Sequence, residues 1–554
     1  MFQPVHWFHS YGRNNVMKRL LYIFALIASF CVACEKNPAE QDDVKRDPYY
    51  LELLKAYDAG KQFKAVQVTE GSNVVVFEDG SKITVPKSAF QINDHTSTPV
   101  PVIDVLPGSP WWRIDGLMLG IQVLSSETPK EQARLVYVYY DNKTLYMHIS
   151  NREVLIFDSK KLNEEVDIER LQNIPTVYIN TGGKGIYDKE NYVDGTITIK
   201  DPEKLYSDVE EFSAAMGIRG RGNSTWSFPK KPYKVKLKEK ASIFGMGADK
   251  EWALLANYSD RTLMRNILAM KLSEICGFAW TPHMYSVHVY LNNEYQGVYT
   301  LCEHKKVHKD RVDIDLDAGD VYLEIEQQQD ETTCWWTGMG VPMMFSDPEV
   351  PSDELLAEIK KWFSDFEASL YSNYLADPDR GYAAYIDVDS FIDYYLVQEL
   401  AKNTDGNLRK SSFITKKKGG KLEMYHLWDF DLTFGNSGGL LHDPEGYFIM
   451  NFTPGWTIGD NWFNKMFTDP AFVDRVQARL AELMPQFEAV PAFIDRQASI
   501  LSKAQERNFQ VWDINVSVDW VDCPSLGSYE AEVEFLKEFY TKRLKWMSDA
   551  LNKL

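Results

Sequence analysis

The chain is poor in cysteine, in net positive charge and in long apolar runs. Of its six cysteines, the four that follow the amino-terminal segment show no Cys-x-x-Cys spacing, so the sequence gives no indication of a structural zinc site. The net charge of −20 argues against general nucleic-acid binding, because no basic field spreads over the chain. A local basic pocket for a phosphorylated ligand is still compatible with that charge. Beyond the amino terminus, no stretch is long and apolar enough to span a bilayer.

The amino terminus is similar to a bacterial lipoprotein signal. Lys18 and Arg19 precede an apolar run, residues 20–30, that is too short for a spanning helix. We expect Met17 to be the start, and Cys34 to be the lipidated residue of an exported, membrane-anchored protein in the periplasm or at the cell surface. The alternative is a tail with a chance apolar run. An exported location permits disulfides, but free buried thiols are equally compatible with the four later cysteines: Cys276, Cys302, Cys334 and Cys523.

The length of 554 residues and the changes in composition predict several parts. We expect a signal peptide, a tether with a small β-hairpin segment, a small β module and a large α+β domain: residues 1–34, 35–105, 106–170 and 171–554. The hairpin prediction rests on alternating residues around an Asp-Gly turn. The β module is rich in aromatic residues that form either a core or a sugar-stacking surface: Trp111, Trp112, Tyr137 and Tyr139.

Two carboxylates stand among apolar and aromatic residues in His426-Leu-Trp-Asp-Phe-Asp-Leu-Thr-Phe-Gly-Asn436. In an extended segment, side chains i and i+2 point the same way, so Asp429 and Asp431 would converge. Like charges held together among apolar neighbours are costly unless a cation lies between them. Mg²⁺ takes oxygen ligands and often arrives with a phosphate, so the pattern favours a magnesium site. The alternative is a strand end whose aspartates cap backbone groups.

A glycine-rich, basic segment, Gly217-Ile-Arg-Gly-Arg-Gly-Asn-Ser-Thr-Trp226, precedes a predicted strand at Tyr233–Leu237. Its glycines and small hydroxyl residues leave many backbone N–H groups exposed, which suits an anion. On the strand, Lys234 and Lys236 share one face. A lysine on the strand after a phosphate-covering loop is the arrangement that protein kinases use. The alternative is a basic β-hairpin with solvated lysines.

Asp405 lies on a turn that follows a predicted helix, Phe391–Leu400, and precedes a predicted hairpin and Asp429. Helix, loop aspartate, hairpin and metal-binding aspartate is the order found in phosphoryl-transfer kinases. Such enzymes need an acidic base near the acceptor and further carboxyl or amide ligands for the metal. Asp405 and Asn407 would supply these groups, although both are also ordinary turn residues.

Between residues 174 and 472, four ordered blocks are far more specific together than any one alone. They are Arg219-Gly-Arg-Gly-Asn-Ser-Thr-Trp226 with Pro229-Lys-Lys-Pro-Tyr-Lys-Val-Lys-Leu237, Trp252-Ala-Leu-Leu-Ala-Asn-Tyr258 with Leu263-Met-Arg-Asn266, Tyr295-Gln-Gly-Val-Tyr-Thr-Leu-Cys-Glu303, and Trp428-Asp-Phe-Asp-Leu-Thr-Phe-Gly435. These blocks resemble the CotH-type kinase family, which is named for spore coat protein H.

The resemblance implies an atypical protein-kinase-like core in residues 171–554, with a helical carboxy-terminal region, that binds ATP and Mg²⁺ or Mn²⁺. By position, Asp405 would be the catalytic base, and Asp429 and Asp431 would bind the metal. Many relatives have a His-Asn pair where this chain reads Leu408-Arg-Lys-Ser-Ser412, so Asn407 is the substitute ligand here. The residues expected to hold the nucleotide are Arg219, Arg221, Asn223, Ser224, Lys234, Lys236 and Glu303.

The function expected from this resemblance is phosphorylation of Ser or Thr in a surface or secreted protein. The expected partners are ATP, a protein acceptor and a membrane contacted only through the lipid anchor, with no nucleic acid. One rival is a non-catalytic binding or structural lipoprotein, including a glycan-associated one, because fold does not fix function. Another is a metal-dependent hydrolase that uses the same aspartates.

Overall fold

The computed structural model describes residues 172–554, apart from residues 517, 519, 520 and 522, and short segments between residues 63 and 158. The expected signal peptide, with Cys34, and the acidic part of the tether lie outside these described residues. The chain divides into two compact units, residues 1–105, 110–112 and 119–168, and residues 106–109, 113–118 and 169–554. Among the helices that the structure describes, none has the length and apolar character needed to cross a membrane.

The amino-terminal segments form three separate three-stranded sheets. Their strands are β1 (Phe63–Val68), β2 (Ser72–Phe77) and β3 (Lys82–Pro86), then β4 (Ile103–Val105), β5 (Trp111–Ile114) and β6 (Leu117–Gln122), and last β7 (Leu135–Asp141), β8 (Thr144–Ile149) and β9 (Arg152–Asp158). The Asp-Gly turn is confirmed between β2 and β3: Gly80 has φ +82°, and the Ser81 N–H donates to Asp79 Oδ1 at 2.9 Å.

A closed barrel of seven strands begins the second unit, in the order β10-β11-β12-β13-β14-β16-β15. The strands are β10 (Thr176–Asn180), β11 (Val193–Lys200), β12 (Glu211–Gly220), β13 (Tyr233–Ala241), β14 (Asp249–Leu255), β15 (Met284–Leu291) and β16 (Glu294–Glu303). Alternate apolar residues, such as Val177 with Ile179 and Val235 with Leu237, are buried, as the period of a strand requires. The parallel pairing of β10 with β15 closes the barrel.

A five-stranded antiparallel sheet follows, in the order β18-β19-β17-β20-β21. Its strands are β17 (Val321–Ile325), β18 (Cys334–Trp336), β19 (Pro342–Asp347), β20 (Ser412–Lys416) and β21 (Leu422–His426). Every residue of the central strand β17 is buried, including Glu324. A charged side chain buried in such a strand needs a partner or a function.

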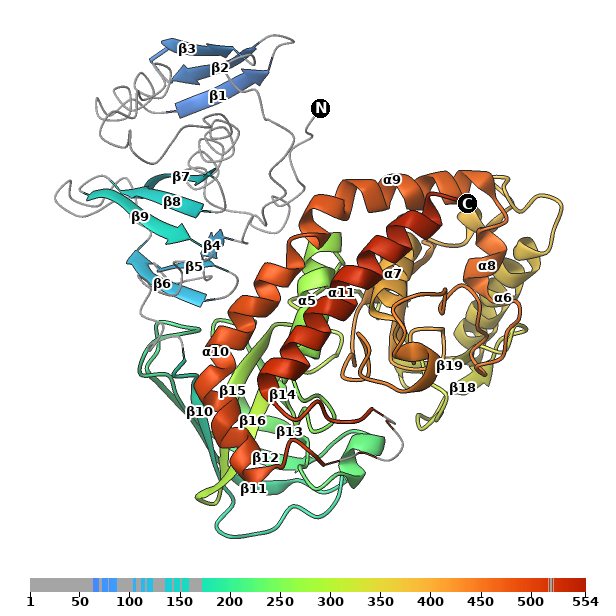
Figure 1. Ribbon diagram of the computed structural model, residues 1–554. Helices are drawn as coiled ribbons and strands as arrows, with labels where there is room; N and C mark the ends of the chain where they lie inside the picture. Colours follow the sequence, from blue (N-terminus) through green and yellow to red (C-terminus); the bar gives the residue numbers. More distant parts are fainter. Residues whose placement is uncertain are drawn as a thin grey trace. The chain divides into compact units, whose positions relative to one another are not determined.

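Helices flank both sheets and make up most of the carboxy-terminal region (Figure 1). They are α5 (Arg265–Cys276), α6 (Asp353–Leu370), α7 (Val388–Ala401), α8 (Trp462–Met466), α9 (Pro470–Phe487), α10 (Val490–Val511) and α11 (Tyr529–Leu551), with short 3₁₀ turns η3 (Ser224–Ser227), η4 (Tyr382–Ala384) and η5 (Gly439–Leu441). The long helix α10 packs on α11 and against β16 of the barrel. The chain is therefore a mixed α/β protein. Its four described cysteines, Cys276, Cys302, Cys334 and Cys523, are free thiols.

Candidate functional site

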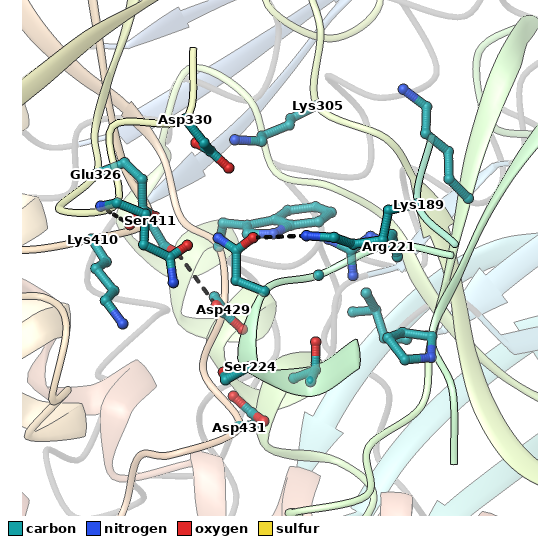
Figure 2. Close-up of a pocket in the computed structure, with 18 of the residues that line it drawn as sticks. Lys189, Arg221, Ser224, Lys305, Glu326, Asp330, Lys410, Ser411, Asp429 and Asp431 are labelled. Carbon is teal, nitrogen blue, oxygen red and sulfur yellow. Dashed lines mark hydrogen bonds between the residues drawn. The ribbon is translucent and has the colours of Figure 1, made fainter. Parts of the chain in front are cut away.

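A polar cavity of about 450 Å³ is lined by loops and strand ends of the barrel and of the five-stranded sheet (Figure 2). Its size is in the range of small-molecule sites. Its basic side chains are Lys189, Arg219, Arg221, Lys234, Lys305 and Lys410. Its acidic side chains are Glu190, Glu324, Glu326, Asp330, Glu331, Asp405, Asp429 and Asp431. Figure 2 shows Glu326, Lys410 and Ser411 on the left, Lys189 and Arg221 on the right, and Asp429 and Asp431 between them.

The glycine-rich loop between β12 and β13 supplies one wall of the cavity. Gly222 has φ +80°, and a Cβ there would lie 2.1 Å from Thr225 Oγ1, so the tight turn requires glycine. Arg221 lies over the ring of Trp428, with its Cζ 5.7 Å from the ring centroid. Burial lowers the pKa of Arg221, and the charges of Asp429 and Asp431 are among those that oppose this shift. The loop therefore carries its guanidinium into electrostatic reach of the two aspartates.

The two lysines on β13 are on one face, as predicted, because both lie near Glu251. Lys234 Nζ is 2.8 Å from Glu251 Oε2, whereas Lys236 Nζ is 3.7 Å from Oε1. The Lys234 side chain is 13% exposed and lines the cavity, while the Lys236 side chain is 50% exposed and does not. Burial lowers the pKa of Lys234, and Glu251 opposes that shift. Only Lys234 of this pair is therefore placed to contact a ligand in the cavity.

The segment with Asp429 and Asp431 is not an extended strand, which corrects the sequence-based argument. Strand β21 ends at His426, and Asp429 has φ +68°, in the left-handed region. Both aspartates nevertheless line the same cavity. The loop is held from outside: Asn266 Oδ1 accepts the Phe430 N–H at 2.7 Å, and Arg265 Nε donates to the Thr433 carbonyl at 3.0 Å. Tertiary hydrogen bonds, rather than a strand period, bring the two carboxylates together.

Serine hydroxyl groups donate hydrogen bonds to both of these aspartates. Ser259 Oγ donates to Asp431 Oδ2 at 2.5 Å, and Ser411 Oγ donates to Asp429 Oδ2 at 3.3 Å. Burial, followed by the charge of Asp429, raises the pKa of Asp431 to about 7. Burial and the charge of Asp429 also raise the pKa of Asp405, although Lys410 opposes this shift. The charge of Asp429 is therefore close enough to disfavour the ionised forms of Asp431 and Asp405.

A divalent cation fits Asp429 and Asp431 on the chemistry of the donors. Within the described residues, no group of three or more His, Cys, Asp and Glu side chains is arranged to hold a metal ion. Mg²⁺, however, is commonly held by one or two carboxylates together with the phosphates of a substrate. The mutual repulsion of these two aspartates would be relieved by such a cation. Of the expected ligands, they are the pair that lines the cavity.

Three other expected site residues lie outside the cavity lining. Lys236 is the half-exposed partner of Glu251. Glu303 is buried at the end of β16 and accepts two hydrogen bonds from His283, from its backbone N–H at 3.0 Å and its Nδ1 at 2.9 Å. Asn407 is buried, and its Nδ2 donates to the Thr453 carbonyl at 2.7 Å. Its Oδ1 has no hydrogen-bond partner, so this amide oxygen is still free to accept a hydrogen bond.

The remaining expected residues do meet in one place. Arg219, Arg221, Asn223, Ser224, Lys234, Asp405, Asp429 and Asp431 all line the cavity. The loop between β10 and β11 also reaches it: Lys189 Nζ donates to Asn223 Oδ1 at 3.5 Å. Sequence reasoning missed Lys189, because a single lysine in a polar loop carries no pattern. Glu324 did offer a signal, since it interrupts the apolar strand β17.

A family model described as CotH kinase protein matches residues 218–547, which is more than half of the chain. The matched segment runs from β12 to the last helix and contains every lining residue named above except Lys189 and Glu190. Comparison with curated proteins gave no match.

Proposed function

The chain belongs to the CotH kinase protein family, and on that premise we propose that its cavity binds ATP with Mg²⁺ or Mn²⁺ and phosphorylates Ser or Thr of a protein. The observation that carries the proposal is the division of charge around the cavity. Arg219, Arg221 and Lys234 come from the glycine-rich loop and its strands, while Asp405, Asp429 and Asp431 come from the loops beside the five-stranded sheet. Cations on one side suit phosphates, and carboxylates on the other suit a metal and an acceptor hydroxyl.

In this proposal, positioning and charge neutralisation do most of the catalytic work, as phosphoryl transfer requires. The guanidinium groups and Lys234 bind the phosphates, and aromatic side chains of the cavity, Phe228, Tyr258 and Trp428, offer surface for the base. A bound Mg²⁺ supplies further positive charge to the phosphate oxygens. Asp405 takes the proton of the acceptor hydroxyl as its oxygen attacks the γ-phosphorus and ADP leaves. The same assignment makes the barrel and the five-stranded sheet the two parts of an atypical kinase-like core.

The location of the activity is also part of the proposal. The sequence of residues 17–34 supports export and attachment of a lipid at Cys34, so the acceptor would be a surface or secreted protein. The net charge of −20 supports a protein acceptor rather than a nucleic acid.

The test is transfer of label from γ-labelled ATP, with Mg²⁺ or Mn²⁺, to a generic Ser/Thr-rich protein acceptor and to the chain itself. Asp429→Asn keeps the shape of the side chain and removes its charge, so we expect transfer to fall by about 10²-fold or more. Asp474→Asn, at an exposed position of α9, is the matched control and should behave as the unaltered protein. Absence of label in every variant would refute the proposal, and release of phosphate without any labelled protein would favour the hydrolase.

A further inference from the structure

The carboxylates on the acidic side of the cavity differ in whether a cationic side chain lies near them. Asp429 and Asp431 accept hydrogen bonds from hydroxyl groups, Ser411 and Ser259, and neither forms an ion pair within the described part of the chain. A divalent cation is the natural counter-charge for that pair. Asp405 and Glu326, by contrast, lie within electrostatic reach of Lys410, whose charge opposes the rise in the pKa of both groups. The two acidic pairs therefore have different sources of positive charge.

Lys410 differs from the other lysines that line the cavity. Lys189 donates to Asn223, Lys234 pairs with Glu251, and Lys305 pairs with Glu324. For the Lys410 ammonium, the described residues provide neither a hydrogen-bond acceptor nor an ion-pair partner within 4.0 Å. Figure 2 shows this side chain on the same side of the cavity as Glu326 and Ser411. A cation lining a polar cavity without a partner is available to a ligand.

The backbone holds Lys410 in place. Its N–H donates to the Asp405 carbonyl at 3.3 Å, and its own carbonyl accepts from Ser412 Oγ at 2.9 Å. The ammonium therefore belongs to the same short loop as the proposed catalytic base. An amide oxygen can ligate a metal, whereas an ammonium group cannot and repels one.

We propose that Lys410 takes the place of a second divalent cation at the transfer end of the cavity, so that the nucleotide-loaded protein holds one divalent cation, at Asp429 and Asp431. This inference rests on the proposed function. The lysine donates up to three hydrogen bonds as a compact point charge, which suits the oxygens of a terminal phosphate. The site then neutralises the phosphates with one metal ion and one ammonium group.

The test counts metal ions rather than turnover. The purified protein is dialysed to equilibrium against Mn²⁺ and a non-hydrolysable ATP analogue, and bound Mn²⁺ is divided by bound nucleotide. We expect a ratio of about one for the unaltered protein and for Lys410→Arg, rising to about two for Lys410→Asn at high Mn²⁺. Lys410→Met should keep a ratio of about one, bind the analogue about 10-fold more weakly and transfer phosphate about 10²-fold more slowly.

Lys417→Met is the matched control, because Lys417 is exposed on the turn between β20 and β21 and lies outside the cavity lining. It should leave the ratio, the affinity and the rate unchanged. Two Mn²⁺ per nucleotide in the unaltered protein would overturn this inference while leaving the proposed function standing. Unchanged binding and transfer in Lys410→Met would overturn it as well. A protein that binds no nucleotide in any variant would overturn both.

Discussion

At the scale of single residues, Lys234 and Lys236 allow a direct comparison of a lysine that lines the cavity with one that does not. They lie two positions apart on β13 and share Glu251, but only Lys234 lines the cavity. We expect Lys234→Met to weaken nucleotide binding about 10- to 100-fold, because it removes a charge-assisted contact to phosphate. Lys236→Met removes the same charge from a half-exposed position and should change the affinity less than about twofold. Calorimetric titration with ATP and Mg²⁺ measures both, and equal losses would contradict the assignment.

A second residue-scale prediction concerns Lys230, which is 1% exposed. Its Nζ donates to the Val298 carbonyl at 2.5 Å and to Asn508 Oδ1 at 2.9 Å, two acceptors that a neutral amine can satisfy. Burial lowers the pKa of Lys230 well below 10.5. The unfolded chain therefore binds the proton that the folded chain excludes, so this residue's contribution to the free energy of unfolding grows as pH rises towards 10.5.

The measurement is urea unfolding of the unaltered protein and of Lys230→Met between pH 7 and pH 10. We expect the advantage of the unaltered protein over the variant to increase with pH, by at most about 1.4 kcal/mol per pH unit. Lys417→Met, at an exposed position, should give a difference that does not depend on pH. A constant difference for Lys230→Met would mean that the buried amine keeps its proton.

The residues of the site show where sequence reasoning succeeds and where it stops. The expectation that Asp429 and Asp431 come together is confirmed, because both line one cavity, whereas the cation that two such carboxylates would bind stays a prediction. The geometric reason given for their convergence was wrong, because the segment turns at Asp429 instead of extending. Nothing in the sequence indicated Lys410 as a site residue, because a lysine in a polar loop is usually solvated. Only the folded structure shows that it lines the same cavity as the aspartates.

At the scale of elements, the segment before α5 acts as a support for the aspartate loop. Ser259 and Asp260 are residue types that favour the cap of a helix, but α5 begins only at Arg265. Asp260 instead accepts the Arg265 N–H at 2.8 Å and its Nη1 at 2.6 Å, while Ser259 is used by Asp431. The helix ends at Gly277, which adopts the left-handed conformation that glycine favours. The residue types before the helix are those of a cap, but Ser259 forms its hydrogen bond with Asp431 of another loop instead of with the helix.

Asn266→Ala tests that support. The change leaves the Phe430 N–H without its acceptor, at a cost of about 1–3 kcal/mol in stability. Because the same hydrogen bond fixes the backbone between Asp429 and Asp431, we expect nucleotide affinity in Mg²⁺ to fall by about 10-fold as well. Asn508→Ala removes a buried amide from α10, away from the cavity lining, and should lower the unfolding free energy while leaving affinity intact. Equal affinities for the two variants would exclude a supporting role for Asn266.

At the scale of the whole molecule, the strands of the barrel were largely predictable but its closure was not. Apolar residues alternate along β10 and β11, and Asn292-Asn293 between β15 and β16 is typical of a hairpin turn. Closure depends on the parallel pairing of Thr176 with His288, residues far apart in the chain, and no local pattern encodes that register. The loop between β10 and β11 reaches the cavity because β11 pairs with β12, with Val193 opposite Ile218, and in this way Lys189 joins a site assembled mostly from later segments.

The carboxy-terminal helices are joined to the site region by one fully buried ion pair. Arg543 of α11 and Glu399 of α7 are both 0% exposed at the side chain, with Nη2 and Oε1 2.5 Å apart. Glu399 also accepts the Phe448 N–H at 2.7 Å and the Met450 N–H at 3.2 Å. Helix α7 leads directly into the loop that carries Asp405. The pair thus links the last helix, the loop around Phe448 and the start of the loop that carries Asp405.

Removing one partner of a buried pair leaves an uncompensated charge, so Arg543→Met should lower the unfolding free energy by about 3–5 kcal/mol. Glu399→Gln alone removes the other charge and leaves the guanidinium buried, so a similar loss is expected. In the double variant neither charge remains, and we expect it to be more stable than Arg543→Met alone by at least about 1 kcal/mol. Chemical unfolding of all four proteins measures this coupling. If the two losses simply add, the charges of the pair contribute nothing specific beyond the hydrogen bonds that Arg543 donates to the Glu399 carbonyl.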